Sequence, residues 1–382
     1  MAAAELLAIL AALPRARVLV LGDLVLDRYT WGSVRRVSPE APVMVLEADR
    51  RESHLGAAAN VASILALWES SAACIGVIGN DAEGQLVRDL LLDAKIDVDG
   101  VLTDPSRPTT TKERFIGRAG AQHPSQVLRV DSEDRTPLAE WLEDAILHQV
   151  SRDITQYDLL LISDYGKGVC TPRVLETAIQ AARSAELPVL IDPMRTPDWQ
   201  RYRGATLLKV NRGETEAAAG ASFLEPRDVL AFGRKLCEQH GLQSLAITLG
   251  GEGTAVIRAD GTGRVLPTIV REVYDVTGAG DLVMAVLGIC LASGVALEEA
   301  AELANLATSI KLERSGAARV SREDLRRELV QQQLMAAVNR IGLESVLQSL
   351  ASEVVPPEAV AGRIPLESKN TCIPGKLPSK SA

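Results

Sequence analysis

The run Thr277–Asp281 reads Thr-Gly-Ala-Gly-Asp and leads directly into the apolar stretch 282–291. Small residues let a backbone approach a ligand closely, and the first N–H groups of a helix have no partner inside it. Such a helix start attracts a phosphoryl group in transfer, and a carboxylate beside it can accept the proton of an attacking hydroxyl. The run therefore predicts Asp281 as a catalytic base, with developing charge stabilised by three preceding residues: Gly278, Ala279 and Gly280. The alternative is a glycine-rich turn in which Asp281 only caps the helix.

Two further motifs follow strand-like stretches and could hold a nucleotide. Asn211 and Glu214 lie three residues apart after the run 207–210. An amide and an acid in such a place can position hydrated Mg²⁺ and phosphate oxygens, although the same spacing also makes a good helix start. The segment 248–253 (Thr-Leu-Gly-Gly-Glu-Gly) could line a nucleotide pocket or form a hairpin turn. The predicted nucleotide site has six residues, of which Glu214 would hold the metal through water: Asn211, Glu214, Thr248, Gly250, Gly253 and Asn305.

Polar residues in the N-terminal part are candidates for binding a sugar. The segment 56–60 (Gly-Ala-Ala-Ala-Asn) opens a predicted helix with small residues and one amide, Asn60. Asp23 and Asp27 follow the first apolar strand, and carboxylates at strand ends commonly grip sugar hydroxyls. They also commonly cap helices, and small residues can serve tight helix packing alone, so both interpretations stay open.

Composition and missing motifs exclude other classes of protein. The net charge is −9, whereas a nucleic-acid binder usually carries a basic domain or stripe. There is no GxxxxGK[ST], and no GxGxxG follows the first strand, which disfavours a P-loop enzyme and a dinucleotide-binding oxidoreductase. The 5 cysteines form no CxxC pair, so we expect free thiols in a reducing cytoplasm and no zinc site. No apolar run is long enough to predict a membrane span.

The scaffold that must position these motifs can be read from the hydrophobic pattern. Short apolar runs predict strands at 17–21, 72–78, 159–162, 188–191, 205–210 and 245–249. Helical stretches lie between them at 57–67, 83–93, 172–185 and 226–240. This alternation predicts an α/β fold with a mostly parallel central sheet and helices on both faces.

Other segments break this rhythm. The stretches 29–51 and 107–131 alternate like strands without helices between them, and we expect an antiparallel flap that covers a bound ligand. The Ala- and Leu-rich N-terminus, Met1–Leu13, predicts an amphipathic helix rather than a signal peptide. We therefore expect one domain over 1–330 and, over 331–382, a docked helix followed by a disordered tail.

Taken together, the motifs resemble those of the ribokinase-like carbohydrate kinases, the PfkB family, in the same order over about residues 15–325. The resemblance implies a three-layer α/β/α sandwich with a small β flap. It also implies that ATP and Mg²⁺ bind between the Asn211, Thr248 and Asp281 motifs, and that a sugar lies under the flap. The implied sugar site includes Asp164, in the run Ser-Asp-Tyr-Gly-Lys-Gly at 163–168, and comprises Asp23, Asp27, Gly56, Asn60, Lys112, Arg129, Asp164 and Lys167.

Within this family the sequence is most similar to the D-glycero-D-manno-heptose-7-phosphate kinases, in the segments 22–29, 37–43, 107–112, 128–131, 163–168 and 272–277. The similarity implies transfer of the ATP γ-phosphoryl group to the anomeric hydroxyl of heptose 7-phosphate. The product would be the 1,7-bisphosphate, a lipopolysaccharide precursor. Because this substrate is anionic, we expect one or two cations to clamp its phosphate, foremost Lys112, Arg129 and Lys167.

Some features depart from that pattern or leave choices open. Ala57 stands where a second Gly is usual, and Met194 stands where a Lys is usual; Lys209 or Arg195 could replace the missing cation. Many heptose kinases carry a nucleotidyltransferase domain with an HxGH motif, which is missing here, so we expect the kinase part only. The alternatives are a kinase for ribose or fructose phosphates, or a sugar- or nucleotide-binding regulator without catalysis. The resemblance further implies a homodimer formed through the flap.

Overall fold

The computed structural model describes residues 2–118, 124–223, 225–268, 276–314 and 319–341. Residues Met1–Val330 form one compact unit and Gln331–Ala382 form another. The sheets and the candidate site belong to the first unit.

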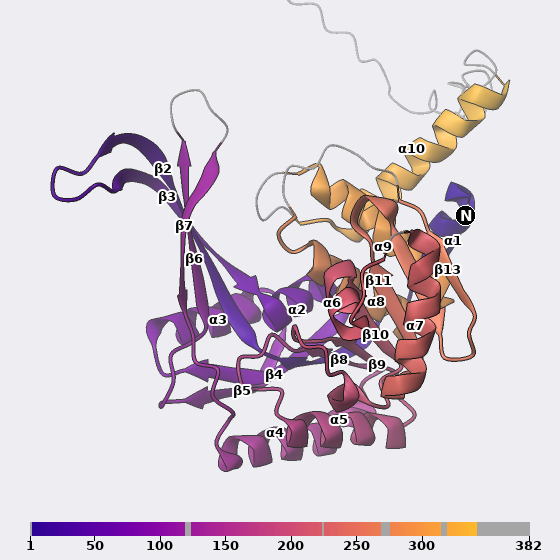
Figure 1. The fold of residues 1–382 in the computed structure, drawn as a ribbon, viewed down its shortest axis with the longest axis horizontal. Helices are drawn as coiled ribbons and strands as arrows, with labels where there is room; N and C mark the ends of the chain where they lie inside the picture. The colour runs from indigo at the N-terminus through magenta and orange to yellow at the C-terminus, as the bar shows by residue number, and fades with distance from the viewer. Residues whose placement is uncertain (1, 119–123, 224, 269–275, 315–318, 342–382) are drawn as a thin grey trace, which may run out of the picture. The chain divides into compact units, whose positions relative to one another are not determined.

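Nine strands of the described residues form the central sheet, in the order β13-β12-β11-β10-β9-β8-β1-β4-β5 (Figure 1). They are β1 (Arg17–Gly22), β4 (Ser71–Gly79), β5 (Asp97–Asp104), β8 (Leu159–Ser163), β9 (Val189–Asp192), β10 (Leu207–Asn211), β11 (Ser244–Thr248), β12 (Thr254–Arg258) and β13 (Gly263–Leu266). Neighbours from β5 to β11 pair in parallel, and β12 and β13 continue the sheet antiparallel. The predicted mostly parallel sheet is confirmed, and each of the predicted strands is present.

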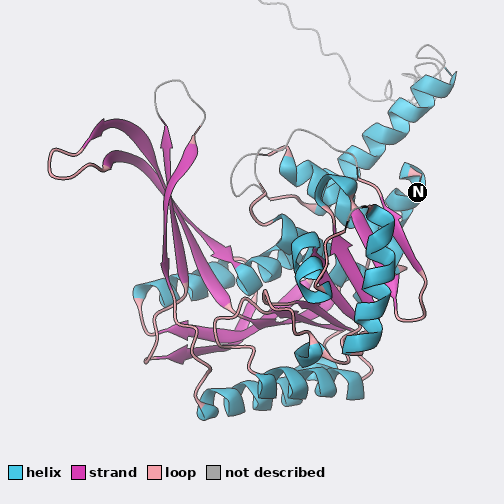
Figure 2. Cartoon of the chain, in the orientation of Figure 1, coloured by secondary structure: helices cyan, strands magenta, loops and turns pink. Residues whose placement is uncertain are grey.

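Helices cover both faces of this sheet (Figure 2). One face packs against α1 (Ala3–Ala12), α2 (Ala57–Leu67), α3 (Ala82–Asp93), α8 (Ala279–Ala292) and α9 (Leu297–Leu312). The other face packs against α4 (Glu140–Asp153), α5 (Pro172–Ser184) and α7 (Pro226–His240). Two further helices are α6 (Arg212–Ala219) and α10 (Arg322–Ile341), and short 3₁₀ turns occupy Ile154–Gln156, Gln200–Tyr202 and Gly250–Glu252.

The alternation of side chains along each strand explains the three layers. Val18 and Val20 of β1 enter the core beneath α2 and α8, whereas Leu19 and Leu21 enter the core beneath α4 and α5. A strand that is buried on both faces must be apolar at every position, as residues 18–21 are. The two cores therefore follow from one continuous apolar stretch placed between two helical layers.

Four strands form a second sheet, the flap, in the order β3-β2-β6-β7. They are β2 (Leu24–Val37), β3 (Met44–Gly56), β6 (Thr111–Arg118) and β7 (Ser125–Ser132), and Figure 1 shows the two hairpins extending together from the central sheet. Each hairpin is antiparallel, as predicted, while β2 and β6 pair in parallel. Because β2 begins directly after Asp23, Asp27 lies within a flap strand and not at the end of β1, which corrects its predicted position.

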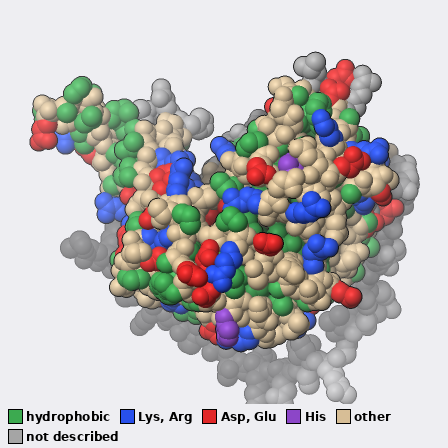
Figure 3. All heavy atoms as spheres, turned by 60° about the horizontal axis from the view of Figure 1, so that its bottom comes forward, with side chains coloured by type: hydrophobic (Ala, Val, Ile, Leu, Met, Phe, Trp, Pro, Cys, Tyr) green, Lys and Arg blue, Asp and Glu red, His purple; other side chains and the backbone are tan. Residues whose placement is uncertain are grey.

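The remaining expectations concern the ends of the chain and its surface. The N-terminal helix is present as α1 and buries Leu6 and Leu10. Residues 342–382, including Cys372, lie outside the described residues, so the disordered tail stays a prediction. No described helix has the length and apolar content needed to cross a membrane. On the face that Figure 3 presents, basic and acidic side chains lie interspersed.

Candidate active site

Three cavities meet at the first turn of α8, where the sequence predicted the catalytic run. A polar cavity of about 540 Å³ lies between the flap and the carboxyl ends of β8, β9 and β10. An apolar cavity of about 270 Å³ lies between the turn after β11 and helices α8 and α9, and a small cavity of about 60 Å³ lies between the base of the flap, α2 and α8. Gly280 lines the polar and apolar cavities, and Asp281 lines the polar and small cavities.

The backbone at this turn requires glycine. Gly278 is the N-cap residue of α8 and has a φ of +73°, in the left-handed region that other residues adopt only with strain. A Cβ at Gly280 would stand 3.3 Å from Lys209 Nζ, so the small residue leaves the ammonium room beside the helix start. The N–H groups of the first turn of α8, at the positive end of the helix, and the Lys209 cation together attract an anion to this position.

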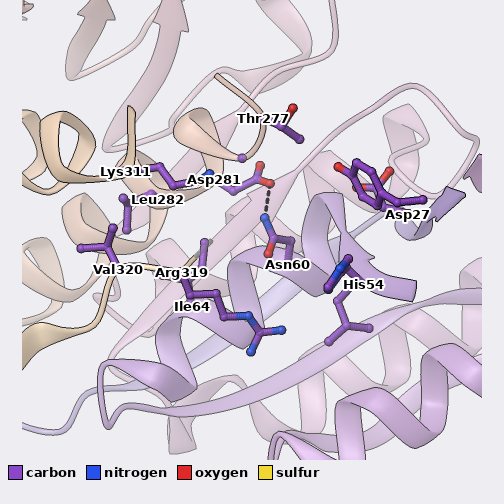
Figure 4. Close-up of a pocket in the computed structure, with 13 residues that line it drawn as sticks. Asp27, His54, Asn60, Ile64, Thr277, Asp281, Leu282, Lys311, Arg319 and Val320 are labelled. Atoms are coloured by element: carbon purple, nitrogen blue, oxygen red, sulfur yellow. Dashed lines mark hydrogen bonds between the residues drawn. The ribbon is translucent and has the colours of Figure 1, made fainter. Parts of the chain in front are cut away.

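The Asp281 carboxylate is held by donors on both oxygens. Asn60 Nδ2 donates to Oδ2 at 2.6 Å (Figure 4), and the Tyr165 hydroxyl donates to Oδ1 at 2.9 Å. Burial raises the pKa of Asp281 above its ordinary value, and the hydrogen bond from Asn60 opposes that rise. A fixed carboxylate with a raised pKa suits a general base.

Lys209 supplies a buried cation next to this carboxylate. Its Nζ lies 2.9 Å from both carboxylate oxygens of Asp192. Burial opposes the charge on Lys209, but Asp192 outweighs it and holds the pKa of Lys209 above its ordinary value. Of the two cations expected to replace one at Met194, Lys209 is therefore the buried one, whereas Arg195 has a side chain that is 91% exposed.

Asn211 and Glu214 form the helix cap that their spacing predicted. Asn211 Oδ1 accepts from the Glu214 N–H at 3.0 Å, and Glu214 Oε2 accepts from the Asn211 N–H at 2.9 Å, so the pair caps α6. Both residues also line the polar cavity. No group of three or more His, Cys, Asp or Glu residues in the described ranges forms a metal cage. Mg²⁺ commonly uses one or two carboxylates plus substrate phosphates, and Glu214 fits that mode.

The predicted nucleotide residues after β11 gather around the apolar cavity. Thr248, Gly250, Gly253 and Asn305 all line it, and the glycine segment also forms the turn between β11 and β12. Gly253 has a φ of +98°, and a Cβ there would stand 2.0 Å from the Leu266 carbonyl oxygen. The buried Asn305 accepts from the Thr254 hydroxyl at 2.6 Å and donates to the Leu266 carbonyl at 3.1 Å. The glycine segment thus forms the predicted turn and also lines a cavity; its use by a nucleotide stays a prediction.

The predicted phosphate-clamping cations line the polar cavity but differ in their partners. Lys167 pairs with Glu133, and Arg129 pairs with Asp131 at 2.8 Å. Lys112 forms no ion pair within the described ranges and lies over the Tyr165 ring, 5.2 Å from its centroid. Burial, together with repulsion from Lys167, lowers the pKa of Lys112. An anion bound in this cavity would stabilise the positive charge on Lys112.

The small cavity brings together residues from the flap and α2. Asp27, His54 and Asn60 line it with Asp281, and Figure 4 shows them around one hollow. Arg114 donates to Asp27 at 2.6 Å. A Cβ at position 56 would stand 2.7 Å from Asp27 Oδ2, so the predicted sugar residue Gly56 gives space for that carboxylate.

Asp23 and Asp164, both predicted to bind the sugar, have different surroundings in the structure. Asp23 does not line the three cavities; its buried carboxylate accepts from the N–H groups of Tyr165 at 2.8 Å, Lys167 at 3.1 Å and Val169 at 3.2 Å. Asp164 does line the polar cavity, and it accepts from the Tyr202 hydroxyl at 2.8 Å. Asp23 therefore anchors the loop that carries Tyr165, Lys167 and Val169.

The structure also adds residues that sequence reasoning did not place in the site. Tyr165 contacts Asp281, and Arg201 lies 3.6 Å from Asp164 and donates to Met194 Sδ at 2.9 Å. Tyr165 lay within the quoted 163–168 run, but a tyrosine beside a glycine carries no local signal of a partner 116 residues away. Ala57 has a φ of +50°, which explains why glycine is usual at this position.

Comparison with known proteins shows which family this chain belongs to. The description "pfkB family carbohydrate kinase" matches residues 15–324. The chain belongs to this family. The match includes the flap, the turn after β11 and the start of α8, so the pfkB family resemblance read from the motifs is confirmed.

Curated relatives of this pfkB chain are longer than it is. The bifunctional protein HldE of Geobacter metallireducens is 40% identical over 303 residues, covering 79% of this chain and 61% of that protein. HldE of Wolinella succinogenes is 36% identical over 342 residues, covering 89% of this chain and 70% of that protein. The chain thus spans about three fifths of the length of the Geobacter relative.

Two solved kinase structures share the fold of this chain at low sequence identity. Arabidopsis thaliana ribokinase complexed with ribose and ATP aligns with a TM-score of 0.65 at 19% identity, over 83% of this chain and 99% of that one. Phosphofructokinase-2 from Escherichia coli in complex with substrates and products aligns with a TM-score of 0.67 at 19% identity, over 84% and 100%. The predicted ribokinase-like fold is therefore confirmed.

Proposed function

We propose that this chain is an ATP-dependent sugar-phosphate kinase that phosphorylates the anomeric hydroxyl of D-glycero-D-manno-heptose 7-phosphate. The observation that carries the proposal is the start of α8, where Gly280 lines both the apolar cavity suited to a nucleotide and the polar cavity lined by cations, and where the Asp281 carboxylate lines that polar cavity. The heptose itself rests on the similarity of the motifs at 22–29, 37–43 and 163–168.

The sugar would lie at the base of the flap, where carboxylate and amide groups converge. Asp27, Asn60 and Asp281 present oxygen and nitrogen atoms suited to sugar hydroxyls around the small cavity. The flap strands β2 and β3 contribute one wall, so closing them over the sugar would exclude water from the reaction.

The distal phosphate of the sugar would bind the cations of the polar cavity. Burial lowers the pKa of Lys112 although Asp27 and Asp131 oppose that change, so a bound phosphate would further stabilise its charge. Lys167 and Arg129 lie on the same cavity and could share the phosphate with Lys112.

The nucleotide would span the apolar and polar cavities. The apolar cavity, with Val283 and Leu312 in its wall, suits an adenine base, and Gly280 lies on both cavities. Phosphate groups passing Gly280 would meet the free amides of α8 and the Lys209 ammonium. Glu214 would hold Mg²⁺ through water, and the ion, when bound, would neutralise phosphate oxygens.

Phosphoryl transfer would then follow from the position of Asp281. The anomeric oxygen forms a bond to the γ-phosphorus, and the bond from that phosphorus to the bridging oxygen breaks, so that ADP leaves with the electron pair. The hydroxyl proton goes to Asp281, and the amides at Gly278–Asp281 stabilise charge on the transferred group.

The test is ADP release with Mg-ATP and a panel of acceptors: heptose 7-phosphate, ribose, ribose 5-phosphate and fructose 6-phosphate. Turnover with heptose 7-phosphate, at a kcat/KM at least 100-fold above the others (about 2.7 kcal/mol), is the expected result. Turnover on another acceptor alone would retain the kinase and reject the heptose. ATP binding without turnover on any acceptor would favour a nucleotide-binding regulator.

A further inference from the structure

Tyr165 connects three parts of the site that are remote in sequence. Its backbone N–H is held by Asp23 at 2.8 Å, at the end of β1. Its ring lies beneath Lys112 of the flap, 5.2 Å from centroid to Nζ, and its hydroxyl donates to Asp281 Oδ1 at 2.9 Å. The hydroxyl is the only polar group of this side chain, and it contacts the Asp281 carboxylate at the start of α8.

The bond to Asp281 has a direct consequence for proton transfer. Asn60 holds Oδ2 and Tyr165 holds Oδ1, so the two donors fix the plane of the carboxylate. A hydrogen bond donated to a carboxylate favours its charged form, whereas burial of Asp281 favours the neutral form. Without Tyr165, burial would protonate Asp281 at a higher pH.

We propose that Tyr165 is a positioning residue for the phosphoryl transfer, whose hydroxyl orients the Asp281 carboxylate and keeps it ionised and ready to accept the sugar proton. The inference rests on the proposed function and adds to it a residue that acts through the catalytic base. It also explains the role of Asp23, which fixes the loop from which the phenol reaches Asp281.

Other charged groups around Asp281 act on the same equilibrium. Besides Tyr165, the charged or titratable groups that share the small cavity with Asp281 are Asp27, Tyr29, His54, Lys311 and Arg319. Those that share the polar cavity with it are Lys112, Arg129, Asp131, Arg135, Asp164, Lys167, Asp192, Arg195, Lys209 and Glu214. Asp192 raises the pKa of Asp281 and Lys209 lowers it, each without a hydrogen bond to that carboxylate in the described structure. Because Tyr165→Phe removes only one oxygen and leaves these groups in place, it isolates the hydroxyl.

The experiment is the pH dependence of kcat/KM for sugar-dependent ADP release in wild type, Y165F and the control Y157F. The acidic limb reports ionisation of Asp281, since kcat/KM follows groups of the free enzyme. We expect Y165F to shift that limb upward by about one pH unit, so that its activity relative to wild type falls by up to roughly tenfold on the acidic side of the limb and is unchanged well above it. The KM for ATP should stay within about twofold, since Tyr165 does not line the apolar cavity. Y157F removes a phenol oxygen from the half-buried end of a 3₁₀ turn and should match wild type.

A second substitution runs in the opposite direction and preserves the fold. Site-specific 3-fluorotyrosine at position 165 gives a more acidic phenol and a stronger donor, and should move the acidic limb downward. An unchanged limb in either variant would overturn the proposal. If Y165F fails to fold, as judged by its thermal melt, the fluorinated variant alone decides the question.

A direct titration separates this inference from the proposed function. The ¹³C resonance of the Asp281 carboxyl, assigned by its loss in D281N, should titrate at a higher pH in Y165F or at a lower pH with 3-fluorotyrosine. If no sugar is phosphorylated by wild type but this shift occurs, the function fails while the control of Asp281 by Tyr165 stands. If wild type is active and neither the limb nor the resonance moves, the function stands and Tyr165 has no such role.

Discussion

Buried charged residues in this site are stabilised by hydrogen-bond donors or by a side chain of opposite charge. Asp281 is almost fully buried, yet donors from Asn60 and Tyr165 reach both of its oxygens. Lys209 is buried as well and is neutralised by Asp192. Buried charges persist only with such partners, because an unpaired one costs several kcal/mol in order of magnitude. The pairing leaves the site stable before a substrate binds.

Replacing Asp281 with Asn should remove the base and keep the shape. We expect D281N to lower turnover by about a hundredfold or more, since an amide cannot accept the sugar proton. ATP affinity, measured by calorimetry, should stay near that of wild type, because the nucleotide residues around the apolar cavity are untouched. Asp93→Asn on the exposed end of α3 is the matched control, and near-normal turnover of D281N would remove Asp281 from its role.

Replacing Lys112 with Met tests the phosphate clamp. We expect the KM for the sugar phosphate to rise roughly tenfold or more, as a charge-assisted contact is lost, while the KM for ATP changes little. Thermal stability should be equal or slightly higher, since burial disfavours the charge on Lys112. Lys235→Met, on the exposed side of α7, is the control. Equal effects of K112M on both KM values would contradict a clamp specific to the sugar phosphate.

At the scale of elements, α7 contacts the loop before β10 through two aromatic rings, and the buried ring nitrogens have no hydrogen-bond partner in the described structure. His240 at the end of α7 packs on Trp199 with ring centroids 5.8 Å apart. The Trp199 indole N–H and both ring nitrogens of His240 have no hydrogen-bond partner in the described structure. Burial lowers the pKa of His240 below its ordinary value of 6.5. The folded protein therefore holds this histidine neutral.

The sign of the resulting pH dependence can be worked out. Below pH 6.5 the unfolded chain protonates His240 and the folded chain resists, so the stability due to the neutral residue is lost as pH falls through the lowered value. Asp23 acts oppositely, because burial and Asp164 raise its pKa to about 6 and its contribution is lost as pH rises through that value. We expect His240→Leu to lose less free energy of unfolding than wild type between pH 7.5 and pH 5.5 in urea titrations. The exposed His148→Gln is the control, and identical losses in H240L and wild type would contradict this account.

At the scale of the whole molecule, the flap exposes the edges of its sheet and several apolar side chains. The strands β3 and β7 form its two edges, and apolar side chains are exposed on both hairpins: Val37, Val43, Met44, Leu128 and Val130. Unpaired edges and exposed apolar side chains favour association. We propose that two copies of the chain associate through their flaps, in line with the homodimer that the family resemblance implies.

The dimer can be tested in solution. Light scattering coupled to size-exclusion chromatography should give twice the chain mass for wild type. Met44→Glu combined with Leu128→Glu should give one chain mass with unchanged circular dichroism, because charges at the contact oppose association. Leu92→Glu, at an exposed position on α3, should remain dimeric. A wild-type monomer at tens of micromolar would rule out the flap dimer.

What the sequence alone determined is local in character. Helices α2 and α7 begin and end where their patterns predicted, at 57–67 and 226–240, because a period of 3.6 residues and the flanking Gly or Pro are local signals. The apolar strands lie where they were predicted to within one or two residues at each end, and the small residues at 278–280 do stand at the start of α8. Most of the residues that these signals selected as site candidates, such as Asn60 and Asp281, do line common cavities in the structure. The division of the chain near residue 330 and the chemical roles of these residues remain predictions.

Only the tertiary structure decided which side chains meet. The parallel pairing of β2 with β6, the phenol of Tyr165 on Asp281 and the pairing of Lys209 with Asp192 join positions far apart in sequence. The direction of a flap strand and the partner of a buried charge depend on how the elements pack, and no local period encodes them. For the same reason Asp23, which follows a strand as a sugar ligand would, anchors a loop from beneath instead of lining a cavity.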